Sequence, residues 1–203
     1  MIAADDPLAL ADWRRRVQDL HARLRAAPDP RAAWADWHAT RSDLFHRHPM
    51  SPLPASARRP GGRIPVFDHD PTLRLAVALD PQDGPEEPVA IGEGTLTRRR
   101  IARTRGLADR LGGELDVFWI GGYGGGLFVP FADATSGGET YGAGRYVVDA
   151  IKGADLGTDA AGRLILDFNM AYHPSCAWNH DYVCPLAPPG NRLPAPVRAG
   201  ERL

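Results

Sequence analysis

Leucine or valine occupies every second position of the stretch Thr72-Leu-Arg-Leu-Ala-Val-Ala-Leu79. This alternation places the large apolar side chains on one face of an extended chain, so the stretch predicts a half-buried β-strand. Similar short segments recur around it: Ile64–Asp68, Val89–Gly92, Leu96–Arg103, Glu114–Ile120, Leu127–Phe131, Arg145–Asp149 and Leu164–Phe168. Turns rich in Gly, Pro and Asp separate them, which favours antiparallel pairing. We therefore expect a mainly β (α+β) chain, with one antiparallel β-sandwich or bent, barrel-like sheet over residues 64–168.

Two amphipathic helices are predicted before these strands. Apolar residues recur every three or four positions in the first, at Leu10, Trp13, Val17, Leu20 and Leu24. Asp29-Pro30 supplies an N-cap and a first-turn proline for the second helix, and Pro49 ends it. A helical hairpin of this size cannot bury both apolar faces by itself. We expect residues 1–50 to form a helical hairpin packed on a β-rich domain of residues 51–203, as a single structural unit.

The composition excludes several classes of protein. The chain is 43% hydrophobic and 24% charged, which excludes disorder, collagen and coiled coil. Its 24 basic and 25 acidic residues give no electrostatic reason to expect nucleic acid or a membrane as a partner. We see no signal-peptide pattern and no apolar segment near the roughly 18 residues of a membrane helix, so we expect a cytoplasmic protein. Lys152 is the only lysine.

The C-terminal tail differs in character from the strand region. Several prolines after Asn169 exclude a regular helix or a central strand over most of it. The tail also carries Tyr172, Trp178, Tyr182 and Leu186, whereas disordered tails are poor in aromatic residues. We therefore expect a long tail that is ordered against the sheet as far as Arg198, with these side chains buried.

Polar side chains concentrate in the glycine-rich connection from Phe131 to Tyr146. It holds two carboxylates, hydroxyl groups, a phenol and a guanidinium: Asp133, Thr135, Ser136, Glu139, Thr140, Tyr141 and Arg145. One interpretation is structural, with Asp133 and Thr135 closing an Asx or ST turn and Arg145 pairing with Glu139. The other interpretation is that these groups face a ligand.

A second cluster contains His173, Cys176, His180 and Cys184. All four are possible zinc ligands, but a structural zinc site normally separates two ligand pairs by a longer loop, so we expect no metal and no cofactor. Two alternatives remain. Cys176 and Cys184 form a disulfide or thiol pair that stabilises the tail, or one activated thiolate lies near a histidine.

Eight motifs follow one another along the chain: Gly124-Gly-Gly-Leu-Phe-Val-Pro-Phe131, Asp133-Ala-Thr-Ser-Gly137, Glu139-Thr-Tyr-Gly142, Gly144-Arg-Tyr146, Leu166-Asp-Phe-Asn169, Pro174-Ser-Cys-Ala177, Cys184-Pro-Leu186 and Asn191-Arg-Leu193. In this order they resemble the DUF1684 family of bacterial and archaeal proteins. The resemblance covers residues 34–203 and includes a His-Pro-x-Ser-Pro-Leu element at His48. Met50 and His173 depart from the family pattern, where we expect glutamine and asparagine. The family is defined by sequence, so the resemblance implies a location for a site and no activity.

Our leading functional hypothesis is a β-rich protein that binds a small polar or anionic molecule, and it leaves open whether hydrolase or transferase chemistry accompanies the binding. The expected cavity is lined by His48, Asp133, Thr135, Glu139, Tyr141, Arg145, Asn169, Cys176 and Arg192. In an enzyme, Cys176 or His48 would be the nucleophile or base, and Asp133 or Glu139 would orient it. Arg145 or Arg192 would hold an anion, while Thr135, Tyr141 and Asn169 would bind the ligand.

The competing hypothesis is a non-catalytic structural or interaction module. In it, the same polar residues form a buried hydrogen-bond network that fixes the loops and the tail on the sheet. The two hypotheses differ in one observable. Side chains that converge on an open cavity favour the first, whereas side chains that saturate one another favour the second.

Overall fold

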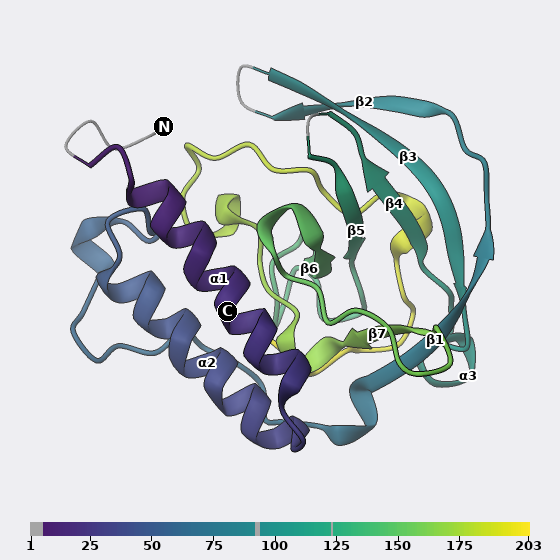
Figure 1. Cartoon of the computed structure of the whole chain (residues 1–203), viewed down its shortest axis with the longest axis horizontal. Helices are drawn as coiled ribbons and strands as arrows, with labels where there is room; N and C mark the ends of the chain where they lie inside the picture. The colour runs from purple at the N-terminus through teal and green to yellow at the C-terminus, as the bar shows by residue number, and fades with distance from the viewer. Residues whose placement is uncertain (1–5, 92–93, 123) are drawn as a thin grey trace.

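The computed structural model describes residues 6–91, 94–122 and 124–203. Its centre is a mostly antiparallel sheet that forms a nearly closed barrel, with two N-terminal helices beside it (Figure 1). The strands are β1 (Arg74–Pro81), β2 (Glu86–Ile91), β3 (Gly94–Arg105), β4 (Asp116–Ile120), β5 (Gly126–Phe131), β6 (Arg145–Asp149) and β7 (Leu164–Asp167). The predicted mainly β (α+β) class is confirmed, and the barrel-like alternative is the one that forms.

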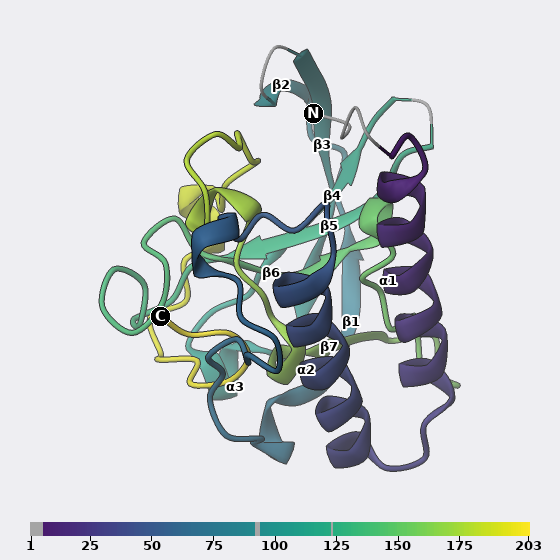
Figure 2. The same cartoon turned by 90° about the vertical axis from the view of Figure 1, so that its left-hand side faces the viewer.

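The strand order is β6-β5-β4-β3-β1-β7, and β2 pairs with β3. β1 and β2 follow each other along the same edge of β3, since Pro81 lies opposite Ala102 and Glu86 lies opposite Arg99. Figure 2 shows the β2–β3 hairpin projecting past the other strands. The barrel closes where β6 meets the segment after β7, through a single bridge between Tyr146 and Tyr172.

The helices α1 (Ala9–Ala26) and α2 (Pro30–Arg47) pack side by side along one flank of the barrel (Figure 2). Asp29 caps α2 as expected, because its carboxylate accepts a hydrogen bond from the backbone N–H of Arg31 at 2.9 Å. A short α3 (Ala108–Leu111) follows β3. Six short 3₁₀ turns complete the described elements: η1 (Ala55–Ala57), η2 (Pro71–Leu73), η3 (Ala150–Lys152), η4 (Phe168–Met170), η5 (Ser175–Ala177) and η6 (Pro189–Asn191).

Two apolar clusters hold these layers together. One fills the barrel, where Phe131 and Phe168 meet edge to face with ring centroids 5.1 Å apart. The other lies between the helices and the outside of the sheet, and it joins Leu20 and Trp37 to Phe118 and Phe128. Burial of both helix faces against neighbours meets the requirement that the sequence set for the hairpin.

The predicted strand over Ile64–Asp68 is wrong. This segment makes only an isolated bridge, between Val66 and Glu201 near the end of the chain. Pro65 has no N–H to donate, which removes one ladder hydrogen bond in the middle of the segment. The other predicted strands are present with shifted ends, except that Gly92 lies outside the described residues and Phe168 begins a 3₁₀ turn.

The tail is ordered against the barrel, but its aromatic residues are not all buried. Leu193, Val197 and Ala199 complete the apolar cluster inside the barrel. Tyr182 and Leu186, by contrast, are 37% and 45% exposed, so their predicted burial is wrong. They lie in a loop that projects from the tail, where nothing in the described residues covers them.

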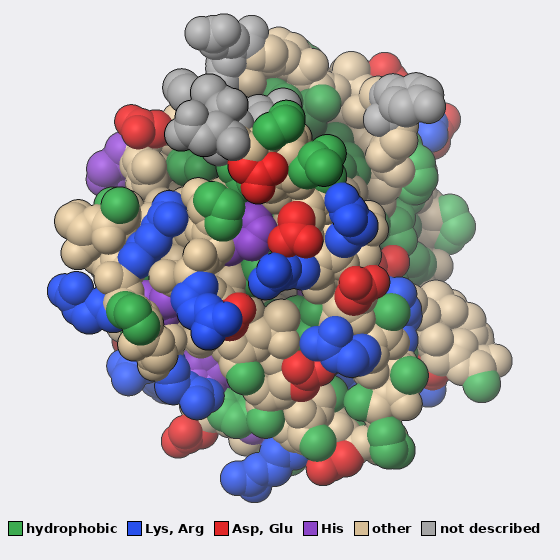
Figure 3. Space-filling view, turned by 60° about the vertical axis from the view of Figure 1, so that its left-hand side comes forward, with side chains coloured by type: hydrophobic (Ala, Val, Ile, Leu, Met, Phe, Trp, Pro, Cys, Tyr) green, Lys and Arg blue, Asp and Glu red, His purple; other side chains and the backbone are tan. Residues whose placement is uncertain are grey.

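Within the described residues, no helix combines the length and the apolar character needed to cross a bilayer. Cationic and anionic side chains are interspersed on the face that Figure 3 displays. Many form pairs along the helices, such as Arg16 with Asp12 and Arg47 with Asp43. Such exposed pairs contribute little to stability, and they leave no strong field of one sign.

Candidate functional site

Asp133 and Arg145 form an ion pair inside the barrel. Arg145 Nη2 lies 2.9 Å from Asp133 Oδ2, and both side chains are 0% exposed. The guanidinium also donates to the backbone carbonyls of Val197, at 2.7 Å, and of Ala199 and Glu201. One arginine therefore ties strand β6, the polar loop and the end of the tail together.

The polar loop closes on itself as the structural interpretation predicts. Asp133 Oδ1 accepts hydrogen bonds from the backbone N–H and the hydroxyl of Thr135, at 2.7 and 2.6 Å. The predicted pair between Arg145 and Glu139 is wrong, because Arg145 points into the barrel. Glu139 instead pairs with Arg198 on the surface, which lowers the pKa of the Glu139 carboxyl.

The other predicted residues lie in separate environments. His48 Nε2 is 3.1 Å from Asp12 Oδ2, and the imidazole packs edge-on against Trp13, where α1 begins and α2 ends. Asn169 is fully buried and binds both backbone groups of Asp70 at 2.8 Å. Arg192 is exposed. The nine predicted residues therefore do not surround one cavity, and any catalytic or ligand-binding role for them stays a prediction.

Cys176 and Cys184 are both free thiols, so the disulfide alternative is not formed. Burial, followed by the nearby Cys184, raises the pKa of the Cys176 thiol. Burial and the neighbouring Cys176 likewise raise the pKa of Tyr141. The described residues contain no group of three or more His, Cys, Asp or Glu side chains placed to hold a metal ion.

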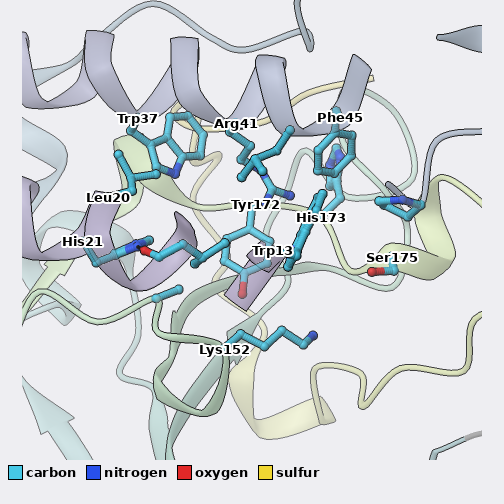
Figure 4. A pocket seen from close by; sticks show the side chains of 14 residues that line it. Trp13, Leu20, His21, Trp37, Arg41, Phe45, Lys152, Tyr172, His173 and Ser175 are labelled. Atoms are coloured by element: carbon cyan, nitrogen blue, oxygen red, sulfur yellow. Dashed lines mark hydrogen bonds between the residues drawn. The ribbon is translucent and has the colours of Figure 1, made fainter. Parts of the chain in front are cut away.

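A cavity outside this set lies between α1, the outer face of the sheet and the projecting tail loop. Its larger part, the outer groove, has a volume of about 370 Å³. Its smaller part, the inner chamber, has a volume of about 60 Å³ and lies beneath α2 (Figure 4). Trp13, Pro52, Lys152 and Ser175 line both parts. The two parts thus adjoin at the only lysine of the chain.

Lys152 is positioned by the turn that follows β6. Its Nζ lies 3.2 Å from Asp149 Oδ2, and the same oxygen accepts a hydrogen bond from the Tyr172 hydroxyl at 2.9 Å. Gly153, directly after it, has a φ of 83°, and a Cβ there would collide with Gln18 of α1. Glycine therefore lets the lysine-bearing turn press against α1, where Arg14 Nη1 donates to the Ile151 carbonyl at 2.8 Å.

Arg41 projects from α2 toward Tyr172, with Lys152 on the opposite side of the chamber (Figure 4). The centre of its guanidinium lies 4.6 Å from the Phe45 ring centroid and 4.4 Å from that of Tyr172. Its Nε donates to Glu201, whose carboxylate is fully buried and also accepts from the His173 backbone N–H at 2.7 Å. Two rings and one carboxylate therefore fix the plane of this guanidinium.

His173 lines the inner chamber as a neutral imidazole. Burial lowers its pKa to about 4. Its Nε2 accepts a hydrogen bond from the Tyr141 backbone N–H at 3.3 Å, which assigns the ring proton to Nδ1. That N–H has no hydrogen-bond partner among the described residues, since the nearest Glu201 oxygen is 3.7 Å away.

Tyr172 lines the inner chamber, and Tyr146 packs beside it with ring centroids 5.6 Å apart. Burial, reinforced by nearby anionic groups, raises the pKa values of both Tyr146 and Tyr172. Both hydroxyls are therefore protonated donors near neutral pH. The Tyr146 hydroxyl donates to the Pro185 carbonyl and so ties the projecting loop to the rim of the outer groove.

The cavity residues were missing from the sequence prediction. Trp13 and Phe45 occupy positions that read as ordinary apolar faces of helices, and Arg41 resembles the many other arginines. Lys152 is the one cavity residue that the sequence sets apart, because it is the single lysine among 24 basic residues and stands three positions after Asp149. Sequence alone gives no reason to connect that pair with α2.

One comparison with known proteins identifies a family. The sequence pattern of DUF1684, a protein family of unknown function, matches residues 62–202. The solution NMR structure of the uncharacterized protein from gene locus rrnAC0354 of Haloarcula marismortui is similar, with 29% identity and a TM-score of 0.55. The match covers 82% of this chain and 90% of that chain. No functionally curated protein matches. The motifs, the fold and the matched residues together show that the chain belongs to the DUF1684 family.

Proposed function

We propose that this protein binds a small amphipathic molecule in the cavity between α1 and the outer face of its sheet. The observation that carries the proposal is the outer groove, which combines apolar walls with a charged inner end. Its volume of about 370 Å³ lies within the range of known small-molecule sites. This proposal keeps the small anionic ligand expected from the sequence and moves it to other residues.

The walls of the outer groove suit an apolar body. They are formed by Leu10, Trp13, Met50, Pro52, Ile91, Leu96, Ile120, Phe128, Ile151, Tyr182, Val183 and Pro185. Burial of apolar ligand surface against such walls is worth roughly 25 cal/mol per Å². The charged lining residues are Arg14, Asp149 and Lys152, so positive charge exceeds negative charge there. A ligand with an apolar body and one negative charge matches both features.

The uncharged fluorophore N-phenyl-1-naphthylamine tests the apolar part of the proposal. We expect its fluorescence to rise on binding. We expect Val183→Asp to weaken binding about tenfold, because it places a charge on the groove wall. Val183 is 53% exposed, so the substitution has little reason to disturb folding.

Leu186→Asp is the matched control for this experiment. Leu186 is exposed on the same loop but does not line the groove, so this variant should bind like the wild type. Absence of binding to the wild type, or equal weakening by both substitutions, would contradict the proposed function.

A separate observation supports a structural role for the polar loop. Asp133, Thr135 and Arg145 form hydrogen bonds with one another and with the tail carbonyls within the barrel. We propose that these residues hold the tail in place, as the competing hypothesis describes. The two proposals concern different residues and are compatible.

A further inference from the structure

We propose that the inner chamber receives the carboxylate of a monocarboxylic acid whose apolar chain occupies the outer groove. This inference rests on the proposed function and names its ligand class. Its centre is Arg41, which lines the inner chamber but not the outer groove. The carboxylate would pass Lys152, which lines both parts, and then meet the Arg41 guanidinium.

Arg41 is already held in the orientation that a carboxylate needs. A guanidinium binds a carboxylate best through two parallel N–H groups in its plane. The guanidinium lies over the rings of Phe45 and Tyr172, and Glu201 binds its Nε edge. The two terminal nitrogens are therefore the part left for another acceptor, and little side-chain freedom is lost when one binds.

The chamber has more hydrogen-bond donors than its protein acceptors use. A guanidinium carries five N–H donors, and within the described residues Arg41 uses only its Nε–H in a hydrogen bond. His173 adds a buried Nδ1–H that also has no partner in this part of the chain. A buried donor without an acceptor is costly, so an acceptor that enters here and reaches the His173 N–H is favoured.

Size and charge narrow the class of ligand. The inner chamber, at about 60 Å³, is much smaller than the outer groove, at about 370 Å³, so it suits a compact head group such as a carboxylate. Asp149 and Glu201 offset the charges of Lys152 and Arg41. Recognition therefore depends on the directed N–H groups of Arg41 and not on a general positive field.

Decanoate and 1-decanol are the probes that test this inference, through displacement of N-phenyl-1-naphthylamine. They share an apolar chain and differ in the head group. We expect the wild type to bind decanoate at least about tenfold more tightly than 1-decanol, because only the carboxylate forms a two-point ionic contact with Arg41.

The double variant Arg41→Gln, Glu201→Gln should lose this preference while it keeps binding to 1-decanol. Both charges of the buried pair are removed together, so no unpaired charge is left behind. Glu201→Gln alone is the matched control, because it keeps Arg41 and should keep the preference. If the double variant does not fold, Arg41→Lys replaces it, since it keeps the charge, loses the planar fork and should reduce the preference several-fold.

Three results would overturn the inference. Equal affinity of the wild type for decanoate and 1-decanol would show that the inner chamber does not bind a carboxylate, and it would leave the proposed function standing. A preference for decanoate that survives the Arg41 substitutions but disappears in Lys152→Met would show that Lys152, and not Arg41, binds the carboxylate. If the wild type binds neither probe nor the fluorophore, the proposed function itself fails.

Discussion

Arg145 and Asp133 are joined side chain to side chain at 2.9 Å in a place that water does not reach, since both are 0% exposed. The same guanidinium donates hydrogen bonds to three backbone carbonyls of the tail. We expect Arg145→Met to lower the free energy of unfolding by about 3–5 kcal/mol, because it leaves a buried carboxylate without its cation. Urea unfolding followed by circular dichroism measures this.

Arg192→Met is the control for that experiment. Arg192 was also predicted as an anion-binding residue, but it is exposed, and its substitution should change stability by no more than about 0.5 kcal/mol. An Arg145→Met protein as stable as the Arg192→Met protein would show that the buried pair does not anchor the tail.

Lys152 offers a direct chemical readout of the cavity. It is the only lysine, and its side chain is 38% exposed at the junction of the outer groove and the inner chamber. We expect an amine-acetylating reagent to modify it, and decanoate to slow that modification by occupying the junction. Peptide mapping by mass spectrometry separates this site from the terminal amine.

Lys152→Arg removes the reactive amine and keeps the charge, so it identifies the signal and should still bind decanoate. Modification of Lys152 at the same rate with and without saturating decanoate would show that the ligand does not occupy the junction.

His173 makes stability depend on pH in a defined window. Its pKa falls from 6.5 in the unfolded chain to about 4 in the folded protein. Between these values the unfolded state binds more protons, so stability is lost as the pH drops from about 6.5 toward 4. The loss attributable to His173 is roughly 3 kcal/mol.

His173→Asn should flatten this part of the stability profile, measured as urea midpoints from pH 7 to pH 4.5. His180→Asn is the matched control, because His180 is exposed on the same tail and its loss should leave the profile unchanged. A His173→Asn profile as steep as that of the wild type would assign the pH dependence to other groups.

The two cysteines should react at different rates. Cys184 is partly exposed and lines the outer groove, whereas Cys176 is buried and has a raised pKa. Since the thiolate is the reactive form, we expect iodoacetamide to modify Cys184 first. Mass spectrometry of partly modified protein tests the order, and faster modification of Cys176 would support the activated thiolate considered from the sequence.

The helices and most strands could be predicted because their signals are local. The spacing from Leu10 to Leu24 and the cap at Asp29 determine α1 and the start of α2, whatever packs against them. The segment from Ile64 failed because one proline outweighs an alternating pattern. The predicted pairing of Arg145 with Glu139 was wrong for another reason. Asp133 and Glu139 stand on the same loop, and only the direction in which β6 faces decides between them.

The cavity could not be predicted because no single segment contains it. Arg41 comes from α2, Lys152 from the turn after β6, and Tyr172 from the tail. Each residue alone has an ordinary explanation, as a helix surface, a loop or a core aromatic. Their meeting depends on how the barrel closes and where the helical hairpin packs, which is information carried by long-range contacts.

The barrel closes through one residue pair. Only two backbone hydrogen bonds, at 2.9 and 3.0 Å, join Tyr146 to Tyr172, whereas β4, β5 and their neighbours share longer ladders. Opening a short ladder takes less free energy than opening a long one, so we expect the barrel to open most readily between Tyr146 and Tyr172. The Tyr172 hydroxyl donates to the Asp149 carboxylate across this closure, and Lys152 forms an ion pair with the same carboxylate. A molecule that draws Lys152 away from Asp149 would therefore alter the contact that Asp149 makes with Tyr172 across the closure of the barrel. Binding of such a molecule should change the rate of amide hydrogen exchange at Tyr146 and Tyr172.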